Sequence, residues 1–125
     1  MAKNENTTSS EILTEEETEE LDKAVGTNST YVHKFSEPFE WMGKTYETLT
    51  FDFGKLRGKD ALAIYRELSM RGIMVISGRT SQEYQIRVAS RACGLGVDAF
   101  DSMTFRDIEI ILSKTRNFIP SAALL

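Results

Sequence analysis

The stretch from Tyr31 to Leu68 reads YVHKFSEPFEWMGKTYETLTFDFGKLRGKDALAIYREL. Its first half alternates polar and apolar residues, as two short strands do, and it can reverse direction at Met42-Gly43-Lys44. Gly43 suits this position because glycine accepts the positive φ of a tight hairpin turn. The pattern therefore predicts a β-hairpin with strands over residues 31–39 and 44–53.

A helix is predicted after the hairpin, over residues 59–71. Asp60 stands in its first turn, where a negative charge favours the helix dipole. Gly72 follows as a C-terminal cap. One apolar face is formed at three- and four-residue spacing by Ala61, Ile64, Tyr65 and Leu68.

Two further helices are predicted, over residues 81–93 and 105–118. Capping boxes begin both: Ser81 precedes the first, and Thr104 with Asp107 opens the second. Gly94 or Gly96 ends the first, and Pro120 stops the second. Between them, residues 97–103 have room for one helical turn and a link. We therefore expect an α+β fold in which an N-terminal β-hairpin packs with about three α-helices.

The same helical periodicity assigns side chains to faces. In helix 81–93, an apolar face opposes a basic side that we expect to face solvent. The apolar face holds Tyr84, Val88, Ala89, Ala92 and Cys93, and the basic side holds Arg79, Arg87 and Arg91. The apolar stripe of helix 105–118 holds Phe105, Ile108, Ile111, Leu112 and Thr115.

Three local signals leave alternatives open. The alternation breaks at Thr48-Leu49, which suits a β-bulge or a change of face. Pro38 has no amide hydrogen and indicates an edge strand. The run Ile73-Met74-Val75-Ile76 is too short for a buried helix, so it predicts either an extra strand or a buried connector.

The chain is unevenly charged. Residues 1–25 hold eight acidic residues and two lysines, a net charge of −6, whereas the whole chain carries −4. A segment so charged and so poor in apolar residues cannot bury enough surface to offset its ordering entropy. We predict a disordered acidic arm over residues 1–29, which could form a short helix over residues 10–25 on docking to a partner. One folded domain follows over 30–120, and residues 121–125 form a C-terminal tail.

Several classes of protein are disfavoured by the composition. The folded part is nearly neutral and lacks the basic stripe of a nucleic-acid binder. No apolar run approaches the ~20 residues that span a membrane, and the acidic N-terminus is unlike a signal peptide. The single cysteine, Cys93, excludes an internal disulfide and fits a reducing compartment. We expect a cytoplasmic protein that binds neither nucleic acid nor membrane.

The sequence supplies few groups for chemistry. We expect His33, the one histidine, to lie at the surface or at a strand edge, and Cys93 to be a buried, inert thiol. Two such ligands cannot build a structural zinc site. The glycines near Lys55 and near Leu95 match neither a phosphate loop nor a dinucleotide motif. We predict no catalytic, metal or cofactor-binding residue, and therefore no enzyme.

Aromatic residues crowd into the hairpin. One interpretation is that they form the core beneath the helices. The other is that one face of the hairpin stays apolar for a partner, because two strands have two faces and three short helices cover one of them well. The candidate partner-binding residues are Phe35, Phe39, Trp41, Tyr46, Phe51 and Phe53.

The order of these motifs resembles the tail assembly chaperones of tailed bacteriophages, over about residues 31–119. Each motif is short, and their order and spacing carry the resemblance. The matching positions are Pro38, Phe39 and Trp41 in the first strand; Gly43 and Lys44 in the turn; Tyr46, Leu49 and Thr50 in the second strand; Asp60, Ala61 and Leu62 at a helix start; Ala89 to Leu95 at a helix end; and Met103, Thr104 and Asp107 at the last helix start.

The resemblance implies a function without catalysis. Such a protein is made late in infection in the host bacterial cytoplasm, where it binds and solubilises the phage tape measure protein while the tail tube polymerises. It is absent from the mature virion. Its expected partners are the tape measure protein, the tail tube protein and further copies of itself. The alternative from another class is a small acidic regulatory adaptor whose arm binds a basic partner.

Overall fold

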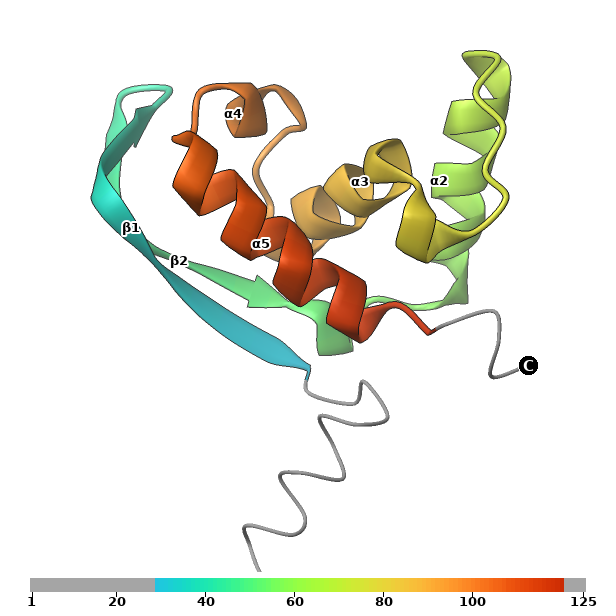
Figure 1. Ribbon diagram of the computed structural model, residues 1–125, viewed down its shortest axis with the longest axis horizontal. Helices are drawn as coiled ribbons and strands as arrows, with labels where there is room; N and C mark the ends of the chain where they lie inside the picture. The colour runs from blue at the N-terminus through green and yellow to red at the C-terminus, as the bar shows by residue number, and fades with distance from the viewer. Residues whose placement is uncertain (1–28, 121–125) are drawn as a thin grey trace, which may run out of the picture.

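The structure, a computed structural model, describes residues 29–120. Almost all of the predicted acidic arm and the whole predicted C-terminal tail lie outside the described residues. The predicted α+β class is confirmed, since a two-stranded antiparallel hairpin precedes the helices (Figure 1). The elements are β1 (Thr30–Trp41), β2 (Lys44–Asp52), η1 (Phe53–Lys55), α2 (Gly58–Met70), η2 (Gly78–Thr80), α3 (Gln82–Cys93), α4 (Asp98–Asp101) and α5 (Phe105–Phe118).

The hairpin reverses where the sequence predicts. Met42 and Gly43 have φ values of 53° and 79°, so both central residues of the turn occupy the left-handed region. This geometry matches the right-handed twist of the strands that it joins. Pairing begins directly at Trp41 and Lys44 and continues to Thr30 and Asp52.

A large bulge interrupts β1. Lys34 pairs with Thr48 whereas Phe39 pairs with Tyr46, so five positions along β1 correspond to two along β2. The break in alternation at Thr48-Leu49 therefore predicts the position of the bulge along the hairpin correctly. The extra residues, however, belong to β1, the strand opposite Thr48. The bulge contains Pro38, which has no amide hydrogen to give to the ladder.

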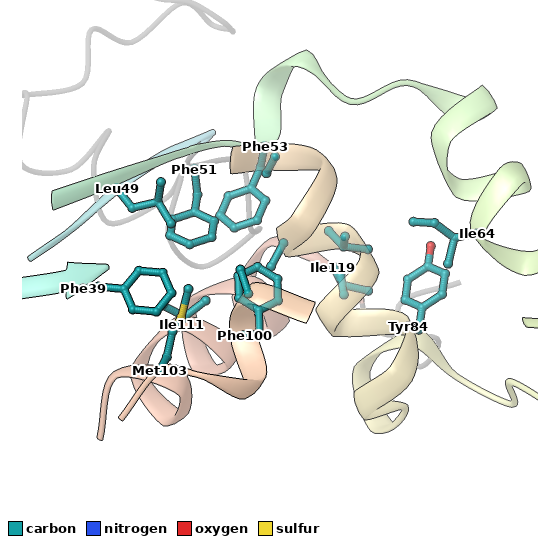
Figure 2. Packing of buried hydrophobic residues seen from close by; sticks show 14 of the residues in the cluster. Phe39, Leu49, Phe51, Phe53, Ile64, Tyr84, Phe100, Met103, Ile111 and Ile119 are labelled. Carbon is teal, nitrogen blue, oxygen red and sulfur yellow. The ribbon is translucent and has the colours of Figure 1, made fainter. Parts of the chain in front are cut away.

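One face of the hairpin carries the core. Phe39, Leu49, Phe51 and Phe53 point toward the helices, where Figure 2 shows Phe100, Met103 and Ile111 facing them. The opposite face is polar apart from the exposed Val32. The core therefore lies between the hairpin and the helices, which is the first of the two interpretations of the aromatic residues.

Helix α3 is the central element of the helical layer. It contacts β2, α5 and α2, whereas α5 lies along β1. Helix α2 packs on α3 through Ile64 and Leu68 and stands at the opposite end of the molecule from the hairpin turn (Figure 1). The surface of α2 is consequently the part of the domain least covered by other elements.

Two side chains do not lie on the faces predicted for them. Arg87 is only 6% exposed although it was assigned to solvent, because it reaches two glutamates between α2 and α3. Phe105 is 81% exposed although it belongs to an apolar stripe. Asp107 faces β1, and Phe105 is two positions before it on the same helix. Two positions rotate a side chain by more than half a helical turn, so Phe105 points away from β1 toward solvent.

The connector between α2 and η2 is also different from both alternatives. It forms neither a strand nor a buried segment. Ile73 and Val75 are half-buried against the core, whereas Met74 and Ile76 are 83% and 88% exposed. Cys93 is likewise half-buried rather than buried.

Candidate functional site

A cluster of polar side chains lies between the bulge of β1 and the start of α5. Asp107 accepts hydrogen bonds from His33 Nε2 at 2.9 Å and from the Thr104 hydroxyl at 2.7 Å. The Ser36 hydroxyl donates to it at 2.9 Å and the Ser36 amide at 3.1 Å. The other ring nitrogen of His33 lies 2.8 Å from the Tyr31 hydroxyl. His33 and Asp107 are both 1% exposed. Of the two positions predicted for His33, the surface is therefore wrong, whereas a strand edge is correct because β1 is an edge of the two-stranded sheet.

The hydrogen bonds in this cluster stabilise a buried charge. Burial would raise the pKa of Asp107, but hydrogen bonds from Thr104, His33 and Ser36 outweigh that effect and hold the pKa below its usual value. Thr104 also caps α5, since its hydroxyl accepts from the Asp107 amide at 3.1 Å. One carboxylate therefore fixes the helix start and the strand bulge together.

The cluster contains a serine, a histidine and an aspartate, the residue types of a hydrolase triad. Their hydrogen bonds, however, connect β1 to α5 and do not form a triad. The Ser36 hydroxyl bonds to Asp107 and not to His33, so the histidine is not placed to take its proton. Burial, and then the charge of Asp107, raise the pKa of Tyr31 and keep its hydroxyl protonated. The carboxylate is already engaged by three side chains. We therefore interpret the cluster as a lock between β1 and α5.

The described part of the chain holds neither a cluster of metal ligands nor a helix that could cross a membrane. Within residues 29–120, no group of three His, Cys, Asp or Glu side chains is arranged to hold a metal ion. Among the helices of the same range, none has the length and apolar character needed to cross a membrane.

The six aromatic candidates for partner binding have two different environments. Four of them are buried in the core and their rings are not accessible to a partner: Phe35, Phe39, Phe51 and Phe53. Trp41 and Tyr46 are half-buried near the hairpin turn, where they flank Phe39. Partner binding by these two remains a prediction.

Several exposed apolar side chains lie on α2 and the connector that follows it, at the opposite end of the molecule from the hairpin turn. Met70, Met74 and Ile76 are 89%, 83% and 88% exposed, and Tyr65 is 41% exposed. We call these four residues the methionine patch. Tyr65 and Met74 line a hollow of about 440 Å³ together with Ser69, Gly72, Ile73 and Val75, whereas Met70 and Ile76 are exposed close to it in the chain. Large exposed apolar side chains that gather in this way mark interaction surfaces.

The end of α2 displays this patch through its backbone. Gly72 has a φ of 77°, and its amide donates to the carbonyl of Ser69, while the Ile73 amide donates to that of Leu68. This pair of bonds is a Schellman motif, which turns Ile73 back toward the helix. Because side chains alternate along the extended connector that follows, Met74 and Ile76 point outward.

Ion pairs hold α2 in the position that presents the patch. The buried guanidinium of Arg87 on α3 donates to Glu67 of α2 and to Glu83, both at 2.7 Å. Burial would lower the pKa of Arg87, but the two glutamates outweigh it and raise the pKa. Nearer the start of α2, Arg91 donates to Asp60 at 2.7 Å. Sequence periodicity missed Arg87 because a helix face does not reveal which basic residue meets acids on another helix.

No protein-family model, curated protein or solved structure matches this chain. Its function is therefore inferred from the surfaces and contacts of its own residues.

The lock predicts a pH-dependent loss of stability in Asp107→Asn. At pH 7 the variant should be less stable than the wild type by about 1–3 kcal/mol, because His33 and Ser36 lose the carboxylate to which they donate. The folded-state pKa of Asp107 is lowered, so its contribution is present above about pH 4 and is lost as the pH falls through the folded value. The difference measured by urea unfolding should shrink at pH 3. Glu109→Gln, at an exposed site on the same helix, is the control. An equal difference at both pH values would contradict this role.

The second prediction compares two arginines of α3. Arg87→Ala should cost about 1.5–3 kcal/mol, the range for hydrogen bonds to charged groups, because its guanidinium is buried. Arg91→Ala removes a pair whose arginine is 42% exposed and should cost less than about 1 kcal/mol. Amide hydrogen exchange should accelerate in α2 more than in the hairpin for Arg87→Ala. Similar costs for both variants would show that Arg87 does not anchor α2.

Proposed function

We propose that this protein is a bacteriophage tail assembly chaperone that binds and solubilises the tape measure protein without catalysis. The observation that carries this proposal is the methionine patch on α2 and the following connector. A chaperone needs an exposed apolar surface, and this one is displayed by a defined helix end.

Methionine suits a surface that must accept many different segments. Its side chain is unbranched and polarizable, so it adapts to irregular apolar partners. A tape measure protein presents a long series of non-identical helical turns, and Met-rich surfaces can repack against such series. The hollow beside Met74 could receive one apolar side chain of the partner while Met70 and Ile76 contact its neighbours.

The helix starts and ends support the motif order on which the resemblance depends. Asp60 accepts from the Arg57 amide at 2.7 Å at the start of α2. Gly94 ends α3 in the left-handed conformation, and Thr104 caps α5. Under this proposal the protein acts in the host bacterial cytoplasm, self-associates, could also meet the tail tube protein, and leaves before the virion is complete.

The acidic adaptor is the second candidate, and the net charge of −6 in residues 1–25 favours it. The two candidates differ in which part of the chain binds the partner. Replacing Glu15, Glu16, Glu17, Glu19 and Glu20 by glutamine should abolish the activity of an adaptor and leave a chaperone largely working.

The patch can be tested by co-expression with a phage tape measure protein, the partner that the proposal assigns. Met74→Ser with Ile76→Ser should abolish co-purification and leave the tape measure protein insoluble. The melting temperature should not change, because both side chains are exposed in the folded protein. Val32→Ser is the control, since Val32 is 57% exposed on the far face of the hairpin. Equal capture by the patch variant and by the control would remove the patch from the proposal.

Self-association gives a separate prediction. Size exclusion with light scattering should find an oligomer for the chain alone, and a larger soluble complex when the tape measure protein is present. A monomer at every concentration that also fails to keep the tape measure protein in solution would contradict the chaperone proposal.

A further inference from the structure

A second hollow, of about 270 Å³, lies near the start of α2. Its lining residue Tyr84 packs on Tyr65 of the methionine patch, with the ring centroids 4.9 Å apart. Its walls come from three helices, and Figure 2 shows Ile64 of α2, Tyr84 of α3 and Ile119 after α5 lying near one another. Leu56, Ala61, Val88 and Phe118 add further apolar lining, and Arg57 and Asp60 are its charged lining residues. At this size it falls below the roughly 300–1,000 Å³ of small-molecule pockets and suits a few apolar side chains.

The N-terminal segment leaves the domain next to this hollow. The Ser29 carbonyl accepts from the Gly54 amide at 3.0 Å, and a Cβ on Gly54 would lie 2.6 Å from the Ser29 Cβ. Leu56, two residues after Gly54, is part of the wall. Val25 is four residues before Ser29, so the chain between them spans at most about 14 Å and keeps Val25 within that distance of Ser29.

The rim of the hollow has the charge that an acidic segment would meet. Lys55, Arg57 and Lys59 are exposed, and within residues 29–120 none of them forms an ion pair. The acid at the rim, Asp60, is already bonded to the Arg57 amide and to Arg91. Of these three cations, Arg57 lines the hollow, where its guanidinium also donates to the Gly54 and Leu56 carbonyls. Lys55 and Lys59 are two residues away on either side of Arg57 in the chain, and the segment that precedes Ser29 carries a net charge of −6 over residues 1–25.

We propose that the acidic arm docks back onto this hollow, with Leu21 and Val25 in the hollow and the preceding glutamates at the basic rim. Leu21 and Val25 are four residues apart, so a helical arm would present both on one side. The tail at 121–125 also starts at the hollow, but it has no acidic side chain to match the cations. The arm then covers this surface whatever partner the methionine patch binds, and a strongly basic partner that takes the arm would uncover it.

The test is disulfide trapping in the full-length chain with Cys93→Ser as background. Val25→Cys is combined with Ala61→Cys, which lines the hollow, or with Leu62→Cys, which is exposed on the next position of α2 and does not line it. Mild oxidation should give several-fold more intramolecular crosslink with Ala61→Cys than with Leu62→Cys. Thermal unfolding of each reduced variant checks that the domain is intact.

A second experiment tests whether electrostatic attraction holds the acidic arm at the hollow. The Ala61 crosslink should fall several-fold in 1 M salt, where screening acts over about 3 Å, and also when Glu15, Glu16, Glu17, Glu19 and Glu20 are replaced by glutamine. Equal trapping at positions 61 and 62, or trapping that ignores both salt and these substitutions, would overturn the proposal. So would a crosslink formed only between chains, or stronger trapping of Ala61→Cys by Leu124→Cys, which would assign the hollow to a second copy or to the tail.

Discussion

The carboxylate of Asp107 binds the bulge of β1 to the start of α5, and the packing of the other elements depends on that contact. A buried carboxylate is costly unless hydrogen bonds satisfy it, and here His33, Ser36 and Thr104 all donate to it. The bulge is what brings Ser36 within reach. With α5 fixed along β1, one side of the hairpin is covered by Ile111, Phe100 and Met103, and a hairpin that would be marginal alone gains a core.

The helical layer continues from that core away from the hairpin turn. Helix α3 lies between α5 and α2, so α2 packs mainly on α3 and leaves much of its own surface uncovered. Arg87 and Arg91 bind α2 from α3, and the two candidate interaction surfaces lie toward its two ends. The basic-rimmed hollow is at the start of α2, and the methionine patch follows its end.

The candidate site was harder to predict than the fold. The aromatic residues of the hairpin are candidates for partner binding in the sequence because they are large and close together. In the structure, Phe51 and Phe53 are among the most buried residues of the domain. The connector Ile73-Met74-Val75-Ile76 was expected to be buried or paired because it is apolar. A run of four apolar residues contains no information on whether a neighbouring element exists to cover it, and here the Schellman turn leaves two of them facing outward.

Local signals in the sequence determined the hairpin turn, the three long helices and their ends. Positive φ at Gly43, the caps at Ser81 and Thr104 and the helix end at Gly94 act over a few residues and are therefore readable along the chain. Only the tertiary structure decided whether His33, Arg87 and Phe105 are buried or exposed. Their environments depend on partners 20 to 74 residues away, or on the lack of a covering element, and no local pattern specifies those. The lock and the anchoring of α2 arise from contacts at that distance.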